Sequence, residues 1–216
     1  MKLHKINGID VFVQESENCV QINDIDGLAL LEIWEPLRNI FPGYELVLCF
    51  HDVPPLDALK SMNAELLEDC LDMRVYSHKF VPHNSTAVAP LSKNNFASFA
   101  ALHNNVNPEC GATSQLICNK WDNWRVFTIN NNEIIGYAII GLAMRDENMG
   151  EVYAVWANSH TQHMSLLSAV TQCAFENSKK KVVYMIDRDN ATALKSALAL
   201  GYKEVGFYIG YRIKSI

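Results

Sequence analysis

The 216-residue chain lacks any apolar run of the roughly 18 residues that a membrane-spanning helix needs. It has six cysteines but no Cys-x-x-Cys pair, so a zinc site or a redox dithiol is not expected. The first ten residues alternate polar and apolar and lack the apolar core of a secretory signal. These absences predict a cytoplasmic protein with buried reduced thiols, no membrane partner and no metal.

A surplus of positive charge is also missing. The chain carries 18 basic and 24 acidic residues, for a net charge of −6. Residues 1–83 hold six basic and 14 acidic side chains, whereas residues 84–216 hold 12 and ten. A nucleic-acid-binding domain concentrates positive charge, so no nucleic acid partner is expected. The second part is the better host for an anionic ligand.

Short apolar segments, separated by turn residues, fill the first part of the chain. Alternating or continuous apolar runs predict strands, and apolar residues at spacings of three and four predict helices. Pro42-Gly43 ends the first of these helices. The predicted elements are strands over residues 9–14, 19–23, 45–51 and 73–81, and helices over residues 27–40 and 56–69.

The second part predicts the order β-α-β-β-β-α-β-α-β. Its first two long strands form a hairpin around Asn130-Asn131-Asn132. Residues 115–121 fit no single pattern. The predicted elements are strands over residues 86–90, 124–130, 133–144, 151–157, 182–187 and 205–213, and helices over residues 93–104, 161–177 and 190–200.

This order, with four segments that fall at matching places, resembles the GNAT superfamily of N-acetyltransferases. The segments are residues 88–91 (VAPL), 132–140 (NEIIGYAII), 151–156 (EVYAVW) and 190–206 (NATALKSALALGYKEVG). The resemblance covers residues 84–216. It implies a mixed α/β (α+β) fold with a mostly antiparallel sheet flanked by helices. Residues 1–83 are then a smaller α/β segment, interpreted as a truncated half of the same fold.

The resemblance also implies acetyl-CoA as co-substrate and a strand that splays from its neighbour to hold the pantetheine arm. Backbone groups of Val155, Trp156 and Ala157 are the candidates for that contact. The next helix points its N-terminus at the pyrophosphate, where free amides and the helix dipole favour an anion. Gln162, His163 and Met164 are the candidates there. Asn190 either bonds the cofactor or caps the helix that follows it.

Two departures from the family weaken this interpretation. Relatives carry the pattern Q/R-x-x-G-x-G/A before the pyrophosphate helix, but residues 158–167 (NSHTQHMSLL) contain no glycine. Many relatives also carry a tyrosine that protonates the leaving thiolate, at a position that Ala197 occupies here. Tyr153, Tyr202 and Tyr208 are alternative proton donors, and the sequence does not choose between them.

Glu151 begins the strand that faces the acceptor amine in this family, so it is the candidate general base. A solvated carboxylate at a strand end is the alternative. The resulting hypothesis is transfer of an acetyl group from acetyl-CoA to the primary amine of a small molecule or peptide. The alternative is a catalytically inactive module that binds a ligand or docks a partner. The sequence leaves monomer and homodimer open.

Overall fold

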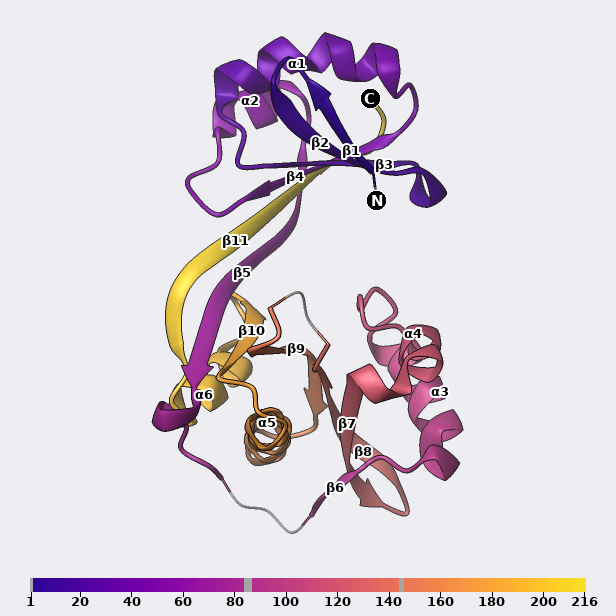
Figure 1. The fold of residues 1–216 in the computed structure, drawn as a ribbon, viewed down its shortest axis with the longest axis vertical. Coiled ribbons are helices and arrows are strands. Elements are labelled where there is room, and N and C mark those ends of the chain that lie inside the picture. The colour runs from indigo at the N-terminus through magenta and orange to yellow at the C-terminus, as the bar shows by residue number, and fades with distance from the viewer. Residues whose placement is uncertain (1, 84–86, 144–145) are drawn as a thin grey trace. The chain divides into compact units, whose positions relative to one another are not determined.

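The computed structural model describes residues 2–83, 87–143 and 146–216 (Figure 1). It divides the chain into two compact units. The first consists of Met1–Leu71 and Gly206–Ile216, and the second of Asp72–Val205. This division differs from the expected border between residues 83 and 84, because the C-terminal segment returns to the first unit.

The first unit is a sheet with helices on one face (Figure 1). Its strand order is β1-β2-β3-β4-β11, with β3 and β4 parallel and the other neighbours antiparallel. Two of the strands predicted from alternation are confirmed at their full lengths. The elements are β1 (Lys2–Ile6), β2 (Ile9–Gln14), β3 (Cys19–Asn23), α1 (Gly27–Ile40), β4 (Glu45–Phe50), α2 (Leu56–Ser61) and β11 (Lys203–Ile213).

Helix α1 shows why residues 27–40 were predictable. The Asp26 side chain caps it by accepting hydrogen bonds from the amides of Leu28 and Ala29, both at 2.9 Å. Leu30, Ile33 and Leu37 repeat at spacings of three and four and are fully buried against the sheet. Strand β1 was not predicted, although residues 1–10 alternate polar and apolar, and its residues are mostly exposed.

The predicted helix over residues 56–69 is confirmed as far as Ser61 and is wrong beyond it. Helix α2 ends at Ser61, and Asn63 takes a left-handed conformation with φ of 53°. Strand β5 (Glu65–Tyr76) then begins, so the strand predicted over residues 73–81 starts and ends earlier. The segment ELLED has strong helix formers, but its place in the hydrogen-bonded strand β5 overrides that weak preference.

The second unit contains the strand order β5-β10-β9-β8-β7-β6. Strands β6 to β9 are antiparallel neighbours, and β9 and β10 are parallel. The predicted hairpin is confirmed, and residues 115–121 form a short helix and turn. Parts of the strands predicted at 86–90 and 133–144 lie outside the described residues. The elements are β6 (Val88–Pro90), α3 (Phe96–Val106), α4 (Ser114–Asn119), β7 (Trp124–Asn131), β8 (Glu133–Gly141), β9 (Met149–Ala157), α5 (His160–Glu176), β10 (Lys181–Asp187) and α6 (Ala191–Ala199).

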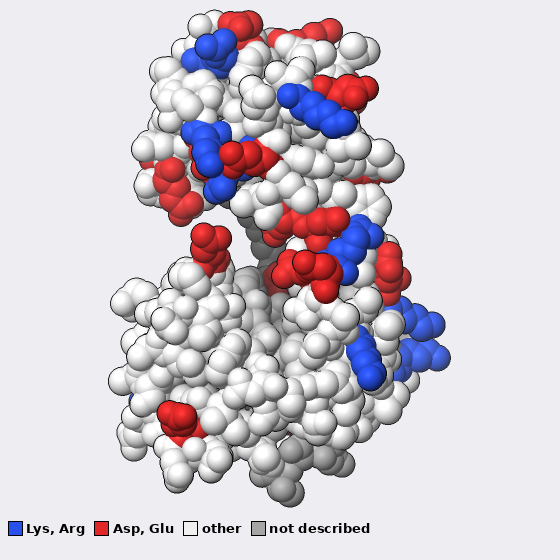
Figure 2. Space-filling model, turned by 180° about the vertical axis from the view of Figure 1, so that it is seen from behind, with Lys and Arg blue, Asp and Glu red and all other residues white. Residues whose placement is uncertain are grey.

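Helices lie on both faces of this second sheet (Figure 1). Phe99 of α3 and Ile117 of α4 pack with Tyr137 and Ile139 of β8 in one cluster. Helix α5 packs against β7, β8 and β9, and α6 packs against α5. Within the described ranges, no helix combines the length and the apolar character needed to cross a membrane. On the face drawn in Figure 2, a broad area of the second unit shows no charged side chain among its described residues.

Gly201 closes α6 at a position that no other residue fits. Its φ of 90° is left-handed, and a Cβ there would lie 2.3 Å from the carbonyl oxygen of Lys79. The next residue, Tyr202, is buried and its hydroxyl lies 2.6 Å from Thr171 Oγ1. This pair of residues joins α6 and α5 to the segment that leaves β5.

Candidate functional site

Strands β9 and β10 separate part of the way along β9. Their parallel pairing ends at Tyr184 and Val152, whereas β9 continues to pair with β8 as far as Gly136 and Ala157. Within the described pairings, residues 153–157 therefore have a strand neighbour on one edge only. The backbone groups on the other edge can bond a ligand.

The three residues predicted to hold a pantetheine arm lie on this open part of β9. Val155, Trp156 and Ala157 are all partly exposed. The Trp156 ring stacks on Tyr137, with ring centroids 5.9 Å apart and planes at 27°. Trp156 therefore packs against the core on one side.

A β-bulge at Tyr153 lies where the separation begins. Ala154 pairs with Ile139 and Val152 pairs with Ile140, so Tyr153 has no partner across the strand. Bulges re-aim side chains and are common beside active sites. The Tyr153 ring meets Trp124 edge to face, with centroids 4.9 Å apart.

Glu151 is half-buried, and its side chain hydrogen-bonds to that of Tyr153. Burial raises the pKa of Glu151, the hydrogen bond from Tyr153 opposes the shift, and Asp72 raises it further. Glu151 is paired with Gly141 on one side and Val183 on the other. It is therefore inside the sheet rather than a solvated carboxylate at a strand end, and such an environment suits a general base.

The start of α5 is compact. Only Asn158 and Ser159 separate β9 from α5. Ser159 Oγ accepts from the amide of Gln162 at 3.3 Å, and the Ser159 carbonyl accepts from the amide of His163 at 2.9 Å. The Gln162 side chain in turn accepts from the Asn158 amide at 3.1 Å. The Gln162 side chain and the amides of Gln162 and His163 are thus already used within the helix start.

The amides that remain for an anion belong to His160 and Thr161, the first two residues of α5. The sequence did not single out Thr161, because the resemblance placed the pyrophosphate contact at Gln162 and the residues that follow it. Met164 is partly buried in the second turn of the helix. Its predicted contact with a pyrophosphate stays a prediction.

His163 is 5% exposed and has an unusual electrostatic environment. Burial and, to a smaller extent, the neighbouring His160 together lower its pKa to about 4. The ring is therefore neutral at physiological pH and offers no positive charge to a phosphate. Within the part of the chain that the structure describes, neither ring nitrogen of His163 has a hydrogen-bond partner, nor does Nε2 of His160.

Asn190 acts as a helix cap in this structure. Its Oδ1 accepts from the amide of Ala193 at 3.0 Å, which fits the capping interpretation. Ala197 is fully buried in α6 and offers no hydroxyl. Of the three alternative proton donors, Tyr202 is buried against Thr171, and Tyr153 lies beside Glu151.

A buried hydrogen-bond network lies behind Trp156, and no pattern in the sequence predicted it. The hydroxyl of Tyr137 donates to His103 Nδ1 at 2.8 Å, because His103 Nε2 donates to the carbonyl of Ala112 at 3.0 Å. Asn107 donates to the same hydroxyl oxygen at 2.5 Å. Burial lowers the pKa of His103 and raises that of Tyr137 to about 12, so both stay neutral.

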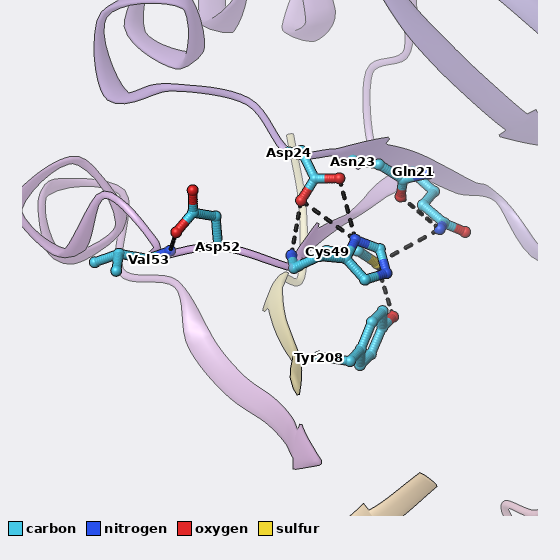
Figure 3. A network of polar contacts seen from close by, with 8 residues as sticks. Gln21, Asn23, Asp24, Cys49, Asp52, Val53 and Tyr208 are labelled. Carbon is cyan, nitrogen blue, oxygen red and sulfur yellow. Dashed lines mark hydrogen bonds and ion pairs between the residues drawn. The ribbon is translucent and has the colours of Figure 1, made fainter. Parts of the chain in front are cut away.

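The third alternative donor, Tyr208, belongs to a polar cluster in the first unit (Figure 3). Its hydroxyl lies 2.8 Å from Cys49 Sγ, and Gln21 donates to the same sulfur at 3.4 Å. His51 Nδ1 lies 3.1 Å from Asp24 Oδ2. Burial raises the pKa of Cys49, which keeps the thiol protonated and a poor nucleophile. Among the described residues, no group of three or more His, Cys, Asp and Glu side chains could hold a metal ion.

Comparison with known proteins identifies the fold. A scan against models of protein families finds no match, and a search of curated proteins finds no significant match. Solved structures do resemble the chain. A GCN5-related N-acetyltransferase from Kribbella flavida matches with a TM-score of 0.68 at 12% identity, over 100% of this chain and 90% of that one.

Two other solved structures extend this likeness. A conserved protein from Staphylococcus epidermidis, described as functionally unknown, has a TM-score of 0.67 at 10% identity, over 96% of this chain and 91% of its own. A tandem GNAT protein from the clavulanic acid biosynthesis pathway has a TM-score of 0.57 at 10% identity, over 94% and 77%. The chain therefore has the fold of the GCN5-related N-acetyltransferases, the GNAT superfamily, with a mixed, mostly antiparallel sheet flanked by helices.

Proposed function

We propose that the protein transfers an acetyl group from acetyl-CoA to the primary amine of an acceptor. One observation carries the proposal. The open edge of β9 begins at the Tyr153 bulge, and the half-buried carboxylate of Glu151 bonds the side chain of that same residue. A free strand edge for a thioester and a base for an amine are thus next to each other in one strand.

The open edge suits the pantetheine arm of the co-substrate. Backbone groups of Val155, Trp156 and Ala157 are proposed to bond it, as a neighbouring strand would. The pyrophosphate would meet the start of α5, where the amides of His160 and Thr161 and the helix dipole favour an anion. Gln162 and His163 would hold the first turn of α5 in place, and Met164 would pack in the second turn. Asn190 would contribute by capping α6.

In the proposed reaction, Glu151 takes a proton from the acceptor ammonium and so frees the nitrogen lone pair. The amine nitrogen then bonds the thioester carbonyl carbon, which acetyl-CoA supplies in activated form, and the carbon–sulfur bond breaks. Free backbone amides of β9 stabilise the oxygen that becomes negative. The leaving thiolate needs one proton, and Tyr153 is the proposed donor because its hydroxyl bonds Glu151, which holds the proton taken from the amine. Once Glu151 has passed that proton on, it accepts the second proton that the nitrogen loses as the neutral amide forms, and this proton is released to solvent.

A non-catalytic ligand-binding module is the second candidate. Two observations favour it: the glycine-free connection of two residues between β9 and α5, and the buried Ala197 in place of a tyrosine. Such a module would keep the fold and the open strand edge but would not catalyse acetyl transfer.

Calorimetry with acetyl-CoA, followed by an amine screen, separates these candidates. The enzyme predicts saturable binding that free CoA competes, and turnover with at least one amine. Glu151→Gln should then lower kcat/KM by about 10²- to 10⁴-fold without weakening acetyl-CoA binding. Glu133→Gln, at an exposed end of β8, is the matched control. Binding of acetyl-CoA without turnover of any amine favours the module, and absence of acetyl-CoA binding overturns the acetyltransferase proposal.

A further inference from the structure

A cavity of about 230 Å³ lies beside the Tyr153 bulge, entirely within the second unit. It is formed by the end of α4, the turn that leads into β7, the end of β8 and the bulge itself. This volume suits a small molecule rather than a drug-sized one. The lining residues are Leu116, Lys120, Asn123, Trp124, Gly141, Ala143 and Tyr153.

The indole of Trp124 presents a donor without an acceptor. Trp124 is 9% exposed, and its Nε1 is buried with no hydrogen-bond partner among the described residues. An indole N–H can only donate. Because buried polar groups are nearly always paired, this one calls for an acceptor atom from outside the described chain.

A positive charge lines the same cavity. Lys120 is exposed, and its ammonium makes no ion pair with any residue in the described ranges. Asn123 adds a side-chain amide. Among the residues that the structure describes, no arginine and no carboxylate line the cavity. One ammonium, without an arginine among the described lining residues, matches a single carboxylate better than a doubly charged phosphate, for which arginine forks are preferred.

A negative side chain adjoins the cavity at the bulge. Tyr153 lines the cavity and bonds Glu151, and Gly141, another lining residue, is the strand partner of Glu151. A carboxylate at this edge attracts an ammonium. The cavity therefore carries one positive side chain, Lys120, and adjoins one negative side chain, Glu151.

We propose that the acceptor is a small amino acid, with its carboxylate on Trp124 Nε1 and Lys120 and its amine directed to Glu151. This inference rests on the proposed function, because it names the substrate class of the same site. The zwitterion of an amino acid has one carboxylate for Lys120 and one ammonium for Glu151, so it matches the charges at the cavity in sign and number. Leu116 and Ala143 provide apolar wall for a neutral side chain.

Calorimetry on the full chain, without acetyl-CoA, tests the cavity with pairs of ligands, an amino acid and the amine that lacks its carboxylate. The probes are L-leucine with isoamylamine, L-phenylalanine with phenethylamine, and phosphoethanolamine as the phosphate-bearing amine. At least one amino acid should bind about tenfold or more tightly than its amine, because only the former has a carboxylate. Lys120→Met and Trp124→Phe should each remove most of that difference. Lys93→Met, which leaves the cavity intact, should preserve it.

Three results overturn the inference: no amino acid binds, each amine binds as tightly as its amino acid, or phosphoethanolamine alone binds. Turnover with acetyl-CoA separates this failure from failure of the proposed reaction. If phenethylamine is acetylated as readily as L-phenylalanine, the reaction stands and the amino acid assignment falls. If amino acids bind by way of Lys120 but none is acetylated, the cavity assignment stands and the proposed reaction falls.

Discussion

Burial moves the pKa values of Glu151 and His163 in opposite directions, and each shift has a measurable consequence. For Glu151 the pKa is raised, so the carboxylate that must accept a proton forms at a higher pH than an ordinary glutamate would allow. Activity should therefore fall as the pH drops through this raised pKa. The charged or titratable groups that act on it are Tyr153, by its hydrogen bond, and Asp72.

The pH profile of kcat/KM measures this shift. Wild type should show an acidic limb with a midpoint above 4.5, the usual value for glutamate. Asp72→Asn should move the midpoint down, since it removes the negative neighbour, while Tyr153→Phe should move it up, since it removes a hydrogen bond to the carboxylate. Identical midpoints in all three proteins would contradict Glu151 as the titrating base.

His163 affects stability rather than turnover. Its pKa is 6.5 in an unstructured chain and about 4 in the fold, so only the unfolded state takes up a proton between these values. Above pH 6.5 the ring is neutral in both states, so His163 does not make the free energy of unfolding depend on pH. As the pH drops from 6.5 toward 4, the unfolded state alone is protonated, so the free energy of unfolding falls. The full loss is about 3 kcal/mol.

Denaturant unfolding at several pH values checks this prediction. His163→Leu should be less sensitive than wild type to the drop from pH 6.5 to pH 4, because no group at position 163 remains to be protonated. His78→Leu, at an exposed position, is the control and should follow wild type. Equal sensitivity of all three proteins would contradict the assignment.

At the scale of single elements, the cap of α6 separates structural and ligand roles for Asn190. Asn190→Ala removes the acceptor for the Ala193 amide and should lower the free energy of unfolding by about 1 kcal/mol. Asn190→Asp keeps an acceptor and should restore most of this loss. Acetyl-CoA affinity should be unchanged in Asn190→Asp, and a marked drop there would instead assign Asn190 to the ligand.

Elements were predictable where local signals agreed. Helix α1 has a capping aspartate, a buried stripe and a Pro-Gly stop. Strand β9 contains the apolar run EVYAVW, one of the segments that carry the resemblance, so the resemblance could place Glu151. The first part of strand β5, residues 65–72, was not predictable, because good helix formers occupy a segment whose conformation is decided by distant strands. The Tyr153 bulge depends on register with β8. The cavity at Lys120 and Trp124 depends on how four elements meet, which no periodicity records.

At the scale of the whole molecule, the first unit is made of two distant stretches of chain. Strand β11 pairs with β4 from Ile209↔Phe50 to Ile213↔Leu46, and Ile213 is buried in the core of that unit. A fragment of residues 1–83 should therefore unfold without a cooperative transition. Residues 1–71 joined through a flexible linker to residues 203–216 should recover cooperativity. Circular dichroism during thermal melting checks both fragments, and a cooperative melt of residues 1–83 alone would contradict the expectation.

The same discontinuity determines the order in which the two units can fold during synthesis. During translation, β1 to β4 leave the ribosome first, but their last strand arrives only after all of Asp72–Val205 has been made. Through that interval β4 has an unpaired edge, and open edges invite pairing with other chains. The second unit occupies one uninterrupted stretch and can complete itself earlier. Strands β1 to β4 are thus made early but cannot complete their sheet until β11 has been made. Chaperones that shield open strand edges should therefore matter most for these first strands.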